Sequence, residues 1–249
     1  MSGGSLARWF KALVGEDLVR WTLAARRRGT PLGEYYRRDT PTVDKPWTEV
    51  EFLAVDLETT GLDPAVDSIV SIGWVPIVRG GIVLSQARHA LVRPSRQMPE
   101  HSAVLHGILD DRAQAAPDLA EVLPVFLMAL RGRIPVAHHA VAERGFLDAA
   151  CMALYDAPLV VPFVDTLALE RRLLGRRAEG AEPGMLRLGA CRERYGLPRY
   201  RAHNALVDAL ACGELMLAQA AHMTPRRTPP RDQRRMDAPR SLRLEQLLT

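Results

Sequence analysis

Three short apolar runs follow one another between residues 51 and 92, and they restrict the fold more than any other feature of the chain. They read "EFLAVDLE" at 51–58, "SIVSIGWVPIV" at 68–78 and "GIVLSQARHALV" at 81–92. Short apolar runs bounded by turn residues predict buried strands. The sequence Arg-Gly-Gly at 79–81 separates the last two runs and predicts a hairpin turn between them.

Helical patterns take over farther along the chain. The segments that predict helices are 118–130, 140–155, 165–174, 186–195 and 204–221, and residues 134–138 predict a short buried strand. Three strands are therefore followed by a helix, a strand and more helices. This order predicts an α/β fold in which a sheet is layered with helices.

The regions outside this core have a different character. Residues 6–28 predict a helix, and the three prolines of 30–48 predict an extended connector. After Met223 the chain is rich in arginine and proline, which is typical of a flexible tail, although 241–248 could form a docking helix. We therefore expect a basic N-terminal extension and linker at 1–48, a globular domain at 49–222 and a tail at 223–249.

Charge is divided unevenly between these regions. Residues 1–40 contain eight Lys/Arg and four Asp/Glu, and residues 224–249 contain seven and three. Residues 41–223 contain 18 basic and 22 acidic side chains, so the core is acidic and both arms are basic. Basic arms often neutralise nucleic-acid phosphates, and they can equally be solvated tails. Contact between an arm and a nucleic-acid backbone is one hypothesis that follows.

Other features exclude several classes of protein. No stretch approaches the about 18 apolar residues of a membrane-spanning helix, and the first residues lack the apolar core of a signal peptide. The three cysteines, Cys151, Cys191 and Cys212, are widely spaced and form no CxxC pair. Neither a disulfide framework nor a zinc site is indicated, and a cytoplasmic location is expected.

Two carboxylates stand together at the end of the first apolar run. Because alternate residues of a strand share a face, Asp56 and Glu58 project together while Leu57 faces the opposite layer. Such close carboxylates repel one another unless a cation lies between them, and their oxygen atoms suit Mg²⁺ or Mn²⁺. Thr59 and Thr60 follow in a polar turn. The alternative is an ordinary acidic strand end.

A histidine and an aspartate flank the start of the last predicted helix. Asn204 is a good N-cap, so His203 lies just before the helix and Asp208 in its early turns. Such a pair suits a phosphodiester hydrolase, in which the aspartate binds metal and the histidine removes a proton from water. A lone histidine here would more simply cap the helix or lie at the surface.

Glu143 is a further acidic candidate, about one turn into the helix that follows the strand ending at His138. On its own it would be taken as a solvated helix residue. Asp148 is a rival acid on the same helix. Five residues correspond to a rotation of roughly 140° in an α-helix, so the two side chains do not share a face.

Together these segments resemble the three motifs of the DEDDh, or DnaQ-like, family of 3′–5′ exonucleases. This family includes the proofreading subunit of bacterial DNA polymerase III, ribonuclease T and oligoribonuclease. The first motif, Asp-x-Glu-Thr-Thr-Gly, is complete at 56–61, and the third, His-x-Ala-x-x-Asp, is complete at 203–208. The second corresponds to 138–147, where Glu143 stands in place of the usual Asp.

Two weaker marks of the family also match, and the resemblance extends over about 50–220. They are "VLHGI" at 104–108 and "VDTLALERRLL" at 164–174. The three motifs occur in the family's order and spacing. The resemblance implies a ribonuclease H-like fold, with a mixed sheet flanked by helices.

The resemblance also implies a set of roles for these residues. Asp56, Glu58 and Asp208 would bind one metal ion, and Asp56 would bridge to a second that Glu143 supports. Such ions lie ~3.5–4 Å apart and stabilise the attacking and leaving oxygens. His203 would be the general base. Residues near the terminal nucleotide would be Thr59, Thr60, Leu62 and His106, although His106 could instead be a packing residue at a helix end.

The leading hypothesis is hydrolysis of single-stranded DNA from its 3′ end, with release of nucleoside monophosphates. An exoribonuclease of the ribonuclease T or oligoribonuclease kind is the enzymatic alternative, because sugar choice depends on contacts to the 2′ position. A catalytically silent nucleic-acid-binding adaptor is the alternative of another class. The presence of competent side chains at all five catalytic positions argues against it. A DNA polymerase or another replication or repair protein is a possible partner.

Overall fold

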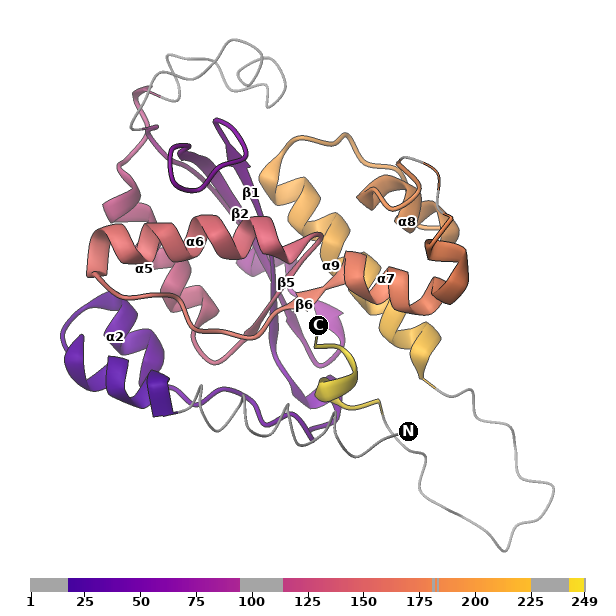
Figure 1. Cartoon of the computed structure of the whole chain (residues 1–249), viewed down its shortest axis with the longest axis horizontal. Helices are drawn as coiled ribbons and strands as arrows, with labels where there is room; N and C mark the ends of the chain where they lie inside the picture. The colour runs from indigo at the N-terminus through magenta and orange to yellow at the C-terminus, as the bar shows by residue number, and fades with distance from the viewer. Residues whose placement is uncertain (1–17, 95–113, 181, 183, 225–241, 249) are drawn as a thin grey trace, which may run out of the picture.

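The computed structural model describes residues 18–94, 114–180, 182, 184–224 and 242–248. Within these residues one mixed sheet of six strands forms the centre of the molecule (Figure 1). The strands are β1 (Phe52–Thr59), β2 (Ile69–Val78), β3 (Gly81–Ile82), β4 (Arg88–Leu91), β5 (Ile134–Ala137) and β6 (Val164–Asp165). Their order is β3-β2-β1-β5-β6, and β4 also pairs with β2. β1 is antiparallel to β2 and parallel to β5, so the predicted mixed sheet is confirmed.

The predicted hairpin is present, but the strand after it is interrupted. Arg79 and Gly80 have φ of 52° and 71°, as a tight hairpin turn requires, and β3 pairs with β2 directly afterwards. The amide of Val83 still donates to the carbonyl of Pro76 at 2.9 Å. Proline has no N–H to return the second bond, so the ladder stops there. The prediction of one strand over 81–92 is therefore wrong: a 3-10 turn at Leu84–Gln86 separates β3 from β4.

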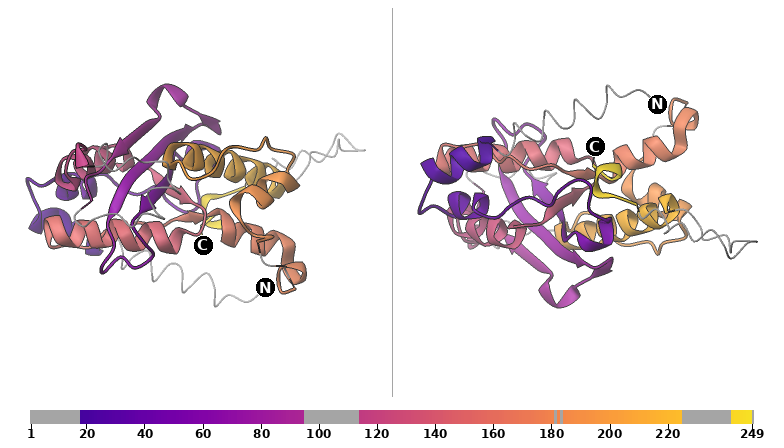
Figure 2. Two further views of the ribbon diagram at one scale, coloured as in Figure 1. Left: turned by 90° about the horizontal axis from the view of Figure 1, so that it is seen from above. Right: turned by 90° about the horizontal axis from the view of Figure 1, so that it is seen from below.

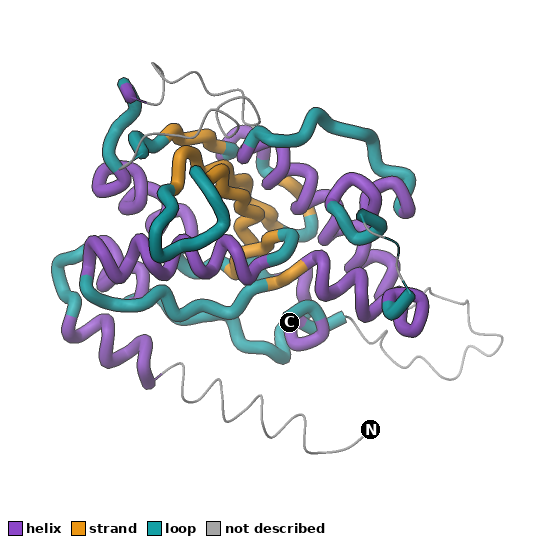
Figure 3. Tube along the Cα trace, turned by 45° about the horizontal axis from the view of Figure 1, so that its top comes forward, coloured by secondary structure: helices purple, strands orange, loops and turns teal. Residues whose placement is uncertain are grey.

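Helices cover both faces of the sheet, as Figures 2 and 3 show. One face packs against α2 (Pro31–Tyr36), α5 (Leu119–Leu130) and α6 (Ala140–Tyr155). The other packs against α7 (Thr166–Leu174), α8 (Leu188–Arg194) and α9 (Ala205–Met223). The alternation along β1 fits this arrangement, because Leu53 and Val55 join the first core and Phe52 and Ala54 the second.

The sequence-based helix predictions hold for these elements to within a few residues. At the start of α5 the amide of Asp118, the N-cap residue, donates to the Glu121 carboxylate at 3.3 Å. The strand β6 was not expected separately from the helix at 165–174. No helix among the described residues is both long enough and apolar enough to cross a membrane.

The prediction of an extended connector at 30–48 is wrong for Pro31–Tyr36. Thr30 accepts a hydrogen bond from the Gly33 amide, and Pro31 occupies the first turn, so this segment has an ordinary helix start. Leu32 and Tyr35 are almost fully buried in the core beneath α5. The segment is therefore part of the packed structure.

The N-terminal helix is described at 18–26, residues 27 and 28 form a turn, and 6–17 of the predicted helix lie outside the described residues. The spacing of its apolar residues does not identify the face of the helix that packs on the core. Leu18 and Trp21 are exposed, whereas Arg20 is buried and donates to the Tyr35 hydroxyl at 3.1 Å and to the Val160 carbonyl at 2.6 Å. Leu23 and Ala24 pack against the first core, and the hydrogen bonds of Arg20 hold the same face of the helix there.

The end of the chain packs against the second core. Residues 225–241 of the predicted tail lie outside the described residues, but Leu242, Leu244, Leu247 and Leu248 are buried. The docking segment contains a 3-10 turn at Leu244–Gln246 rather than the predicted helix. The amide of Leu244 donates to the Lys45 carbonyl, so the docked segment also holds the chain that precedes β1.

Candidate active site

The site begins at the carboxyl end of β1. Asp56 and Glu58 share the face of β1 that packs against α9, and Leu57 between them packs into the opposite core, as the period of a strand predicts. Asp56 lies opposite Gly73 of β2, and Glu58 lies opposite Ser71. Glu58 is 6% exposed and Asp56 is half-buried.

Gly73 allows α9 to bring the third carboxylate to this pair. A Cβ added at Gly73 would lie 2.1 Å from the carbonyl carbon of Ala205, so the first residue of α9 rests directly on the strand. The side chain of Asn204 caps α9 by accepting from the Val207 amide at 3.2 Å. Asp208 follows in the first turn. Each of Asp56, Glu58 and Asp208 has a carboxylate oxygen within 4.8 Å of the others.

Burial and repulsion between carboxylates dominate the electrostatics of this cluster. Burial, and then the charges of Glu143, Glu58 and Asp208, raise the pKa of Asp56 well above its usual value. Burial also raises the pKa of Asp208, and the hydrogen bond from the His203 amide partly opposes that rise. Burial and the repulsion between carboxylates favour the protonated forms of Asp56 and Asp208, so a bound cation would stabilise their ionised forms.

Glu143 lies in the first turn of α6 and faces inward at 7% exposure. Burial raises its pKa to about 8. Among the described residues nothing hydrogen-bonds its Oε2 atom. It is not one of the three clustered carboxylates, but its charge acts on Asp56. Asp148, the rival acid, accepts a hydrogen bond from the Leu159 amide at 2.8 Å and so binds the segment that follows α6.

His203 lies on an exposed turn just before α9. Its φ of 68° is left-handed, and its amide donates to Oδ2 of Asp208 at 2.8 Å. A non-glycine residue in this conformation carries backbone strain, which is common at functional sites. The backbone of His203 therefore orients one carboxylate of the cluster, while its imidazole is on the solvent side.

The turn after β1 contains the residues predicted to contact the terminal nucleotide. Thr59 donates to the Gly61 carbonyl at 2.6 Å. The Thr60 side chain is buried, where its hydroxyl accepts from the Ser68 amide at 2.9 Å. Leu62 is 95% exposed at the tip of the loop. His106 lies outside the described residues.

Asp165 is a residue whose importance the sequence reasoning missed. Its buried carboxylate accepts from the amides of His139 and Ala140 at the start of α6, at 3.0 and 3.1 Å. It also accepts from Leu167 and Ala168 at the start of α7, at 2.9 and 3.4 Å. One side chain thus caps two helices and fixes the position of Glu143. An aspartate directly before a predicted helix was the available signal, but it indicates only one cap.

Comparison with known proteins decides the family. A family model described as "Exonuclease" matches residues 53–216, which include Asp56, Glu58, Glu143, His203 and Asp208. The chain belongs to the DEDDh, or DnaQ-like, family of 3′–5′ exonucleases. The predicted resemblance is therefore confirmed.

Curated relatives include polymerase proteins. The chain is 36% identical over 174 residues to a "DNA polymerase III PolC-type" of Thermotoga petrophila, covering 70% of this chain and only 12% of that protein. It is 34% identical over 178 residues to a "DNA polymerase III subunit epsilon" of Treponema pallidum, covering 70% and 78%. The chain therefore corresponds to a small part of the first relative and to most of the second.

Solved structures show the same fold. The nuclease domain of 3′hExo, a DEDDh family member bound to rAMP, superposes with a TM-score of 0.59 at 17% identity over 70% of this chain and 92% of that one. Exonuclease X in complex with 5′ overhanging duplex DNA gives 0.55 at 24% identity over 69% and 92%. The fold is ribonuclease H-like, as predicted.

Proposed function

We propose that this member of the family is a two-metal-dependent exonuclease that hydrolyses single-stranded DNA from its 3′ end and releases nucleoside monophosphates. The observation that carries the proposal is the cluster of Asp56, Glu58 and Asp208, whose oxygens lie within 4.8 Å of one another. A partly buried group of like charges this close is unfavourable in itself, so a function that supplies cations is the simplest reason for it.

The residues fit Mg²⁺ or Mn²⁺. All four acidic side chains supply hard oxygen ligands, and the buried Oε2 of Glu143 has no hydrogen-bond partner among the described residues. Asp56, Glu58 and Asp208 would hold one ion, and Asp56 with Glu143 the second. Bound there, such ions neutralise charge on the scissile phosphate and lower the pKa of the attacking water.

The chain's own residues would carry the proton transfer and the positioning. An imidazole nitrogen of His203 accepts the proton of the water that attacks phosphorus, since the turn that carries it lies beside Asp208. The bond from phosphorus to the 3′ oxygen of the preceding nucleotide breaks, and that oxygen takes up a proton. Thr59 and Leu62, on the loop after β1, and His106 would contact the terminal nucleotide.

DNA is favoured as substrate because the curated relatives carry the names of DNA polymerase III proteins. A polymerase or another replication or repair protein is proposed as partner on the same ground. Hydrolysis of RNA is the second candidate, since the similar nuclease domain of 3′hExo is described as bound to rAMP. The five competent catalytic side chains disfavour a silent adaptor.

A panel of labelled strands tests the proposal. Single-stranded DNA, duplex DNA and RNA of one sequence, labelled at the 5′ end, are incubated with Mg²⁺ or Mn²⁺. We expect single-stranded DNA to shorten one nucleotide at a time, and a chelator to abolish the reaction. Asp208→Asn controls for a contaminating nuclease. Faster hydrolysis of RNA than of DNA would show that RNA is the substrate. Full activity in chelator would contradict the metal-dependent mechanism.

A further inference from the structure

Two cavities of about 610 and 690 Å³ adjoin one another where α6 and α7 begin. Both are lined by His139, Leu167 and Arg171, and we call the two adjoining cavities together the α6–α7 groove. Arg144 lines one end and Arg187 the other. In Figure 1 the first turns of α6 and α7 meet beyond the ends of β5 and β6.

The groove starts beside the active site. His139 and Ala140 line it, and Glu143 lies one turn farther along the same helix. Two consecutive residues of α6 face different regions: Glu143 faces inward, and the exposed Arg144 lines the groove. A strand whose 3′ end lies at the carboxylates would reach the groove past the first turn of α6.

The groove lies in the basic part of an otherwise acidic core. Residues 171–187 contain five arginines and two glutamates, against a surplus of acid over 41–223 as a whole. Arg171 and Arg187 are exposed, and no ion pair among the described residues involves either of them. Their charges are available to an anion.

Two of the three acidic side chains that line the groove accept hydrogen bonds from backbone amides. Asp165 accepts the four amides of α6 and α7 described above, and Asp148 accepts from the Leu159 amide. Glu182 is the remaining acid on the wall. The carboxylate of Asp165 already accepts the backbone amides at the starts of α6 and α7, so these amides are not available to a phosphate. The arginines therefore provide the positive charge that would bind a polyanion in the groove.

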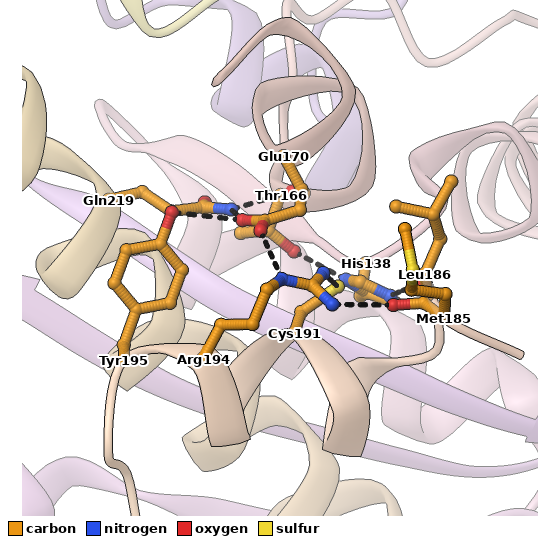
Figure 4. A network of polar contacts seen from close by, with 9 residues as sticks. All are labelled: His138, Thr166, Glu170, Met185, Leu186, Cys191, Arg194, Tyr195 and Gln219. Atoms are coloured by element: carbon orange, nitrogen blue, oxygen red, sulfur yellow. Dashed lines mark hydrogen bonds and ion pairs between the residues drawn. The ribbon is translucent and has the colours of Figure 1, made fainter. Parts of the chain in front are cut away.

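A buried polar network holds the wall that carries Arg187 (Figure 4). His138 hydrogen-bonds the Leu186 carbonyl at 2.9 Å, and Arg194 donates to the Met185 carbonyl at 2.9 Å. Glu170, which is 2% exposed, accepts from Arg194 at 2.8 Å. The backbone next to Arg187 is therefore fixed before any strand arrives, and preorganisation lowers the entropic cost of binding.

We propose that the α6–α7 groove binds the sugar-phosphate backbone upstream of the 3′-terminal nucleotide, with Arg171 and Arg187 contacting its phosphates. The inference rests on the proposed exonuclease function and adds the path of the strand to it. It also places a positive surface within the catalytic domain, in addition to the basic arms.

The test compares long and short substrates. In the double variant Arg171→Gln/Arg187→Gln, kcat/KM is measured for a strand of about twelve nucleotides and for a dinucleotide, which has no upstream phosphate. We expect the ratio of kcat/KM for the long strand to kcat/KM for the dinucleotide to be about tenfold or more lower in the variant than in the wild type. The slope of log kcat/KM against log salt should flatten by about 0.7 for each lost phosphate contact.

A matched pair of exposed basic side chains serves as control. Lys45→Gln/Arg79→Gln removes the same charge from the loop before β1 and from the β2–β3 hairpin, outside the groove. We expect it to leave the ratio and the slope unchanged. An unchanged ratio in the groove variant, or an equal fall in the control, would overturn the proposal.

A separate measurement keeps the groove and the function distinguishable. If wild-type protein hydrolyses no strand, the proposed function has failed. Fluorescence anisotropy of the long strand, measured with Asp208→Asn in Mn²⁺ with and without the two groove substitutions, then still tests the groove. Equal affinity of the two proteins would exclude it whatever the activity of the wild type.

Discussion

Glu170 and Glu143 are both buried carboxylates of this domain, at 2% and 7% exposure, but their surroundings differ completely. Glu170 accepts from Arg194 at 2.8 Å, from the Tyr195 hydroxyl at 3.0 Å and from the Gln219 amide at 2.8 Å (Figure 4). Glu143 has an oxygen without any partner among the described residues, and its pKa is raised to about 8. The same fold thus satisfies one buried acid and leaves another unsatisfied.

The difference separates a structural carboxylate from a functional one. Burying an ionised group without partners costs several kcal/mol, and α7, α8 and α9 show how this chain avoids that cost. At the end of β1, Asp208 accepts a hydrogen bond from the His203 amide, and the pKa values of Asp56 and Asp208 are still raised. These raised values, and the Oε2 atom of Glu143 that has no hydrogen-bond partner among the described residues, support the proposed metal site.

The largest expected effect is on activity at the unsatisfied site. Asp208→Asn removes one metal ligand, so hydrolysis of single-stranded DNA should fall by several orders of magnitude, because each ~1.4 kcal/mol of lost transition-state stabilisation is a factor of ten. The fold should survive, since like-charge repulsion is reduced. Initial rates and thermal melting measured on the same preparation check both expectations. If the variant keeps more than a tenth of the wild-type rate, Asp208 is not an essential metal ligand.

The proton acceptor is the next comparison. His203→Ala should lower kcat by ~10²–10⁴-fold with little change in strand affinity, because a positioned base acts in the transition state. The acidic limb of the pH–rate profile should weaken or disappear. His222→Ala, at the far end of α9, is the control and should retain the rate. A His203 variant with wild-type rate and pH profile would reassign the base.

The satisfied acid should show the opposite pattern. Glu170→Gln leaves Arg194 without its charged partner, and we expect a loss of about 2 kcal/mol in the free energy of unfolding, reduced from the value for a fully buried pair by the partial exposure of Arg194. The control is Glu193→Gln, whose ion pair with Arg199 is exposed on both sides and should contribute little. Denaturant unfolding of both variants measures the difference. Equal losses would mean that the network is not a structural unit.

Much of this site follows from short-range patterns. The two-residue period of a strand places Asp56 and Glu58 on one face, and the Asn204 cap sets the start of α9 and the place of Asp208. Their convergence depends on Gly73, because only a residue without a side chain lets α9 rest on β2. Nothing in the periodicity of either segment indicates that contact. The family motif supplied it, as it also supplied the role of Glu143.

The failures of sequence reasoning have physical causes of their own. The hydrogen bonds of Arg20 override the apolar spacing of its helix, and they join residues far apart in the sequence. The three prolines of 30–48 suggested a connector, although Pro31 after Thr30 is a helix start. The double cap by Asp165 depends on two strand ends being adjacent in the sheet. Such contacts are decided by tertiary structure.

The last and smallest expected effect is the pH dependence of stability without metal. Burial raises the pKa of Glu143 from 4.5 to about 8, so the folded state binds this proton more tightly than the unfolded chain does. The resulting stabilisation is fully present below about pH 4.5 and is lost as pH rises through about 8. The raised pKa values of Asp56 and Asp208 act in the same direction.

In chelator, the melting temperature should therefore fall between about pH 5 and pH 8, and Mg²⁺ or Mn²⁺ should restore it most strongly at the upper end, where cations replace the missing protons. Glu143→Gln keeps a neutral side chain at every pH, so its melting temperature should fall less over this range and exceed that of wild type near pH 8 in chelator. Glu179→Gln, at an exposed position, should follow the wild type. A Glu143→Gln protein with the wild-type pH dependence would show that this carboxylate is satisfied in solution, and the contrast with Glu170 would then be lost.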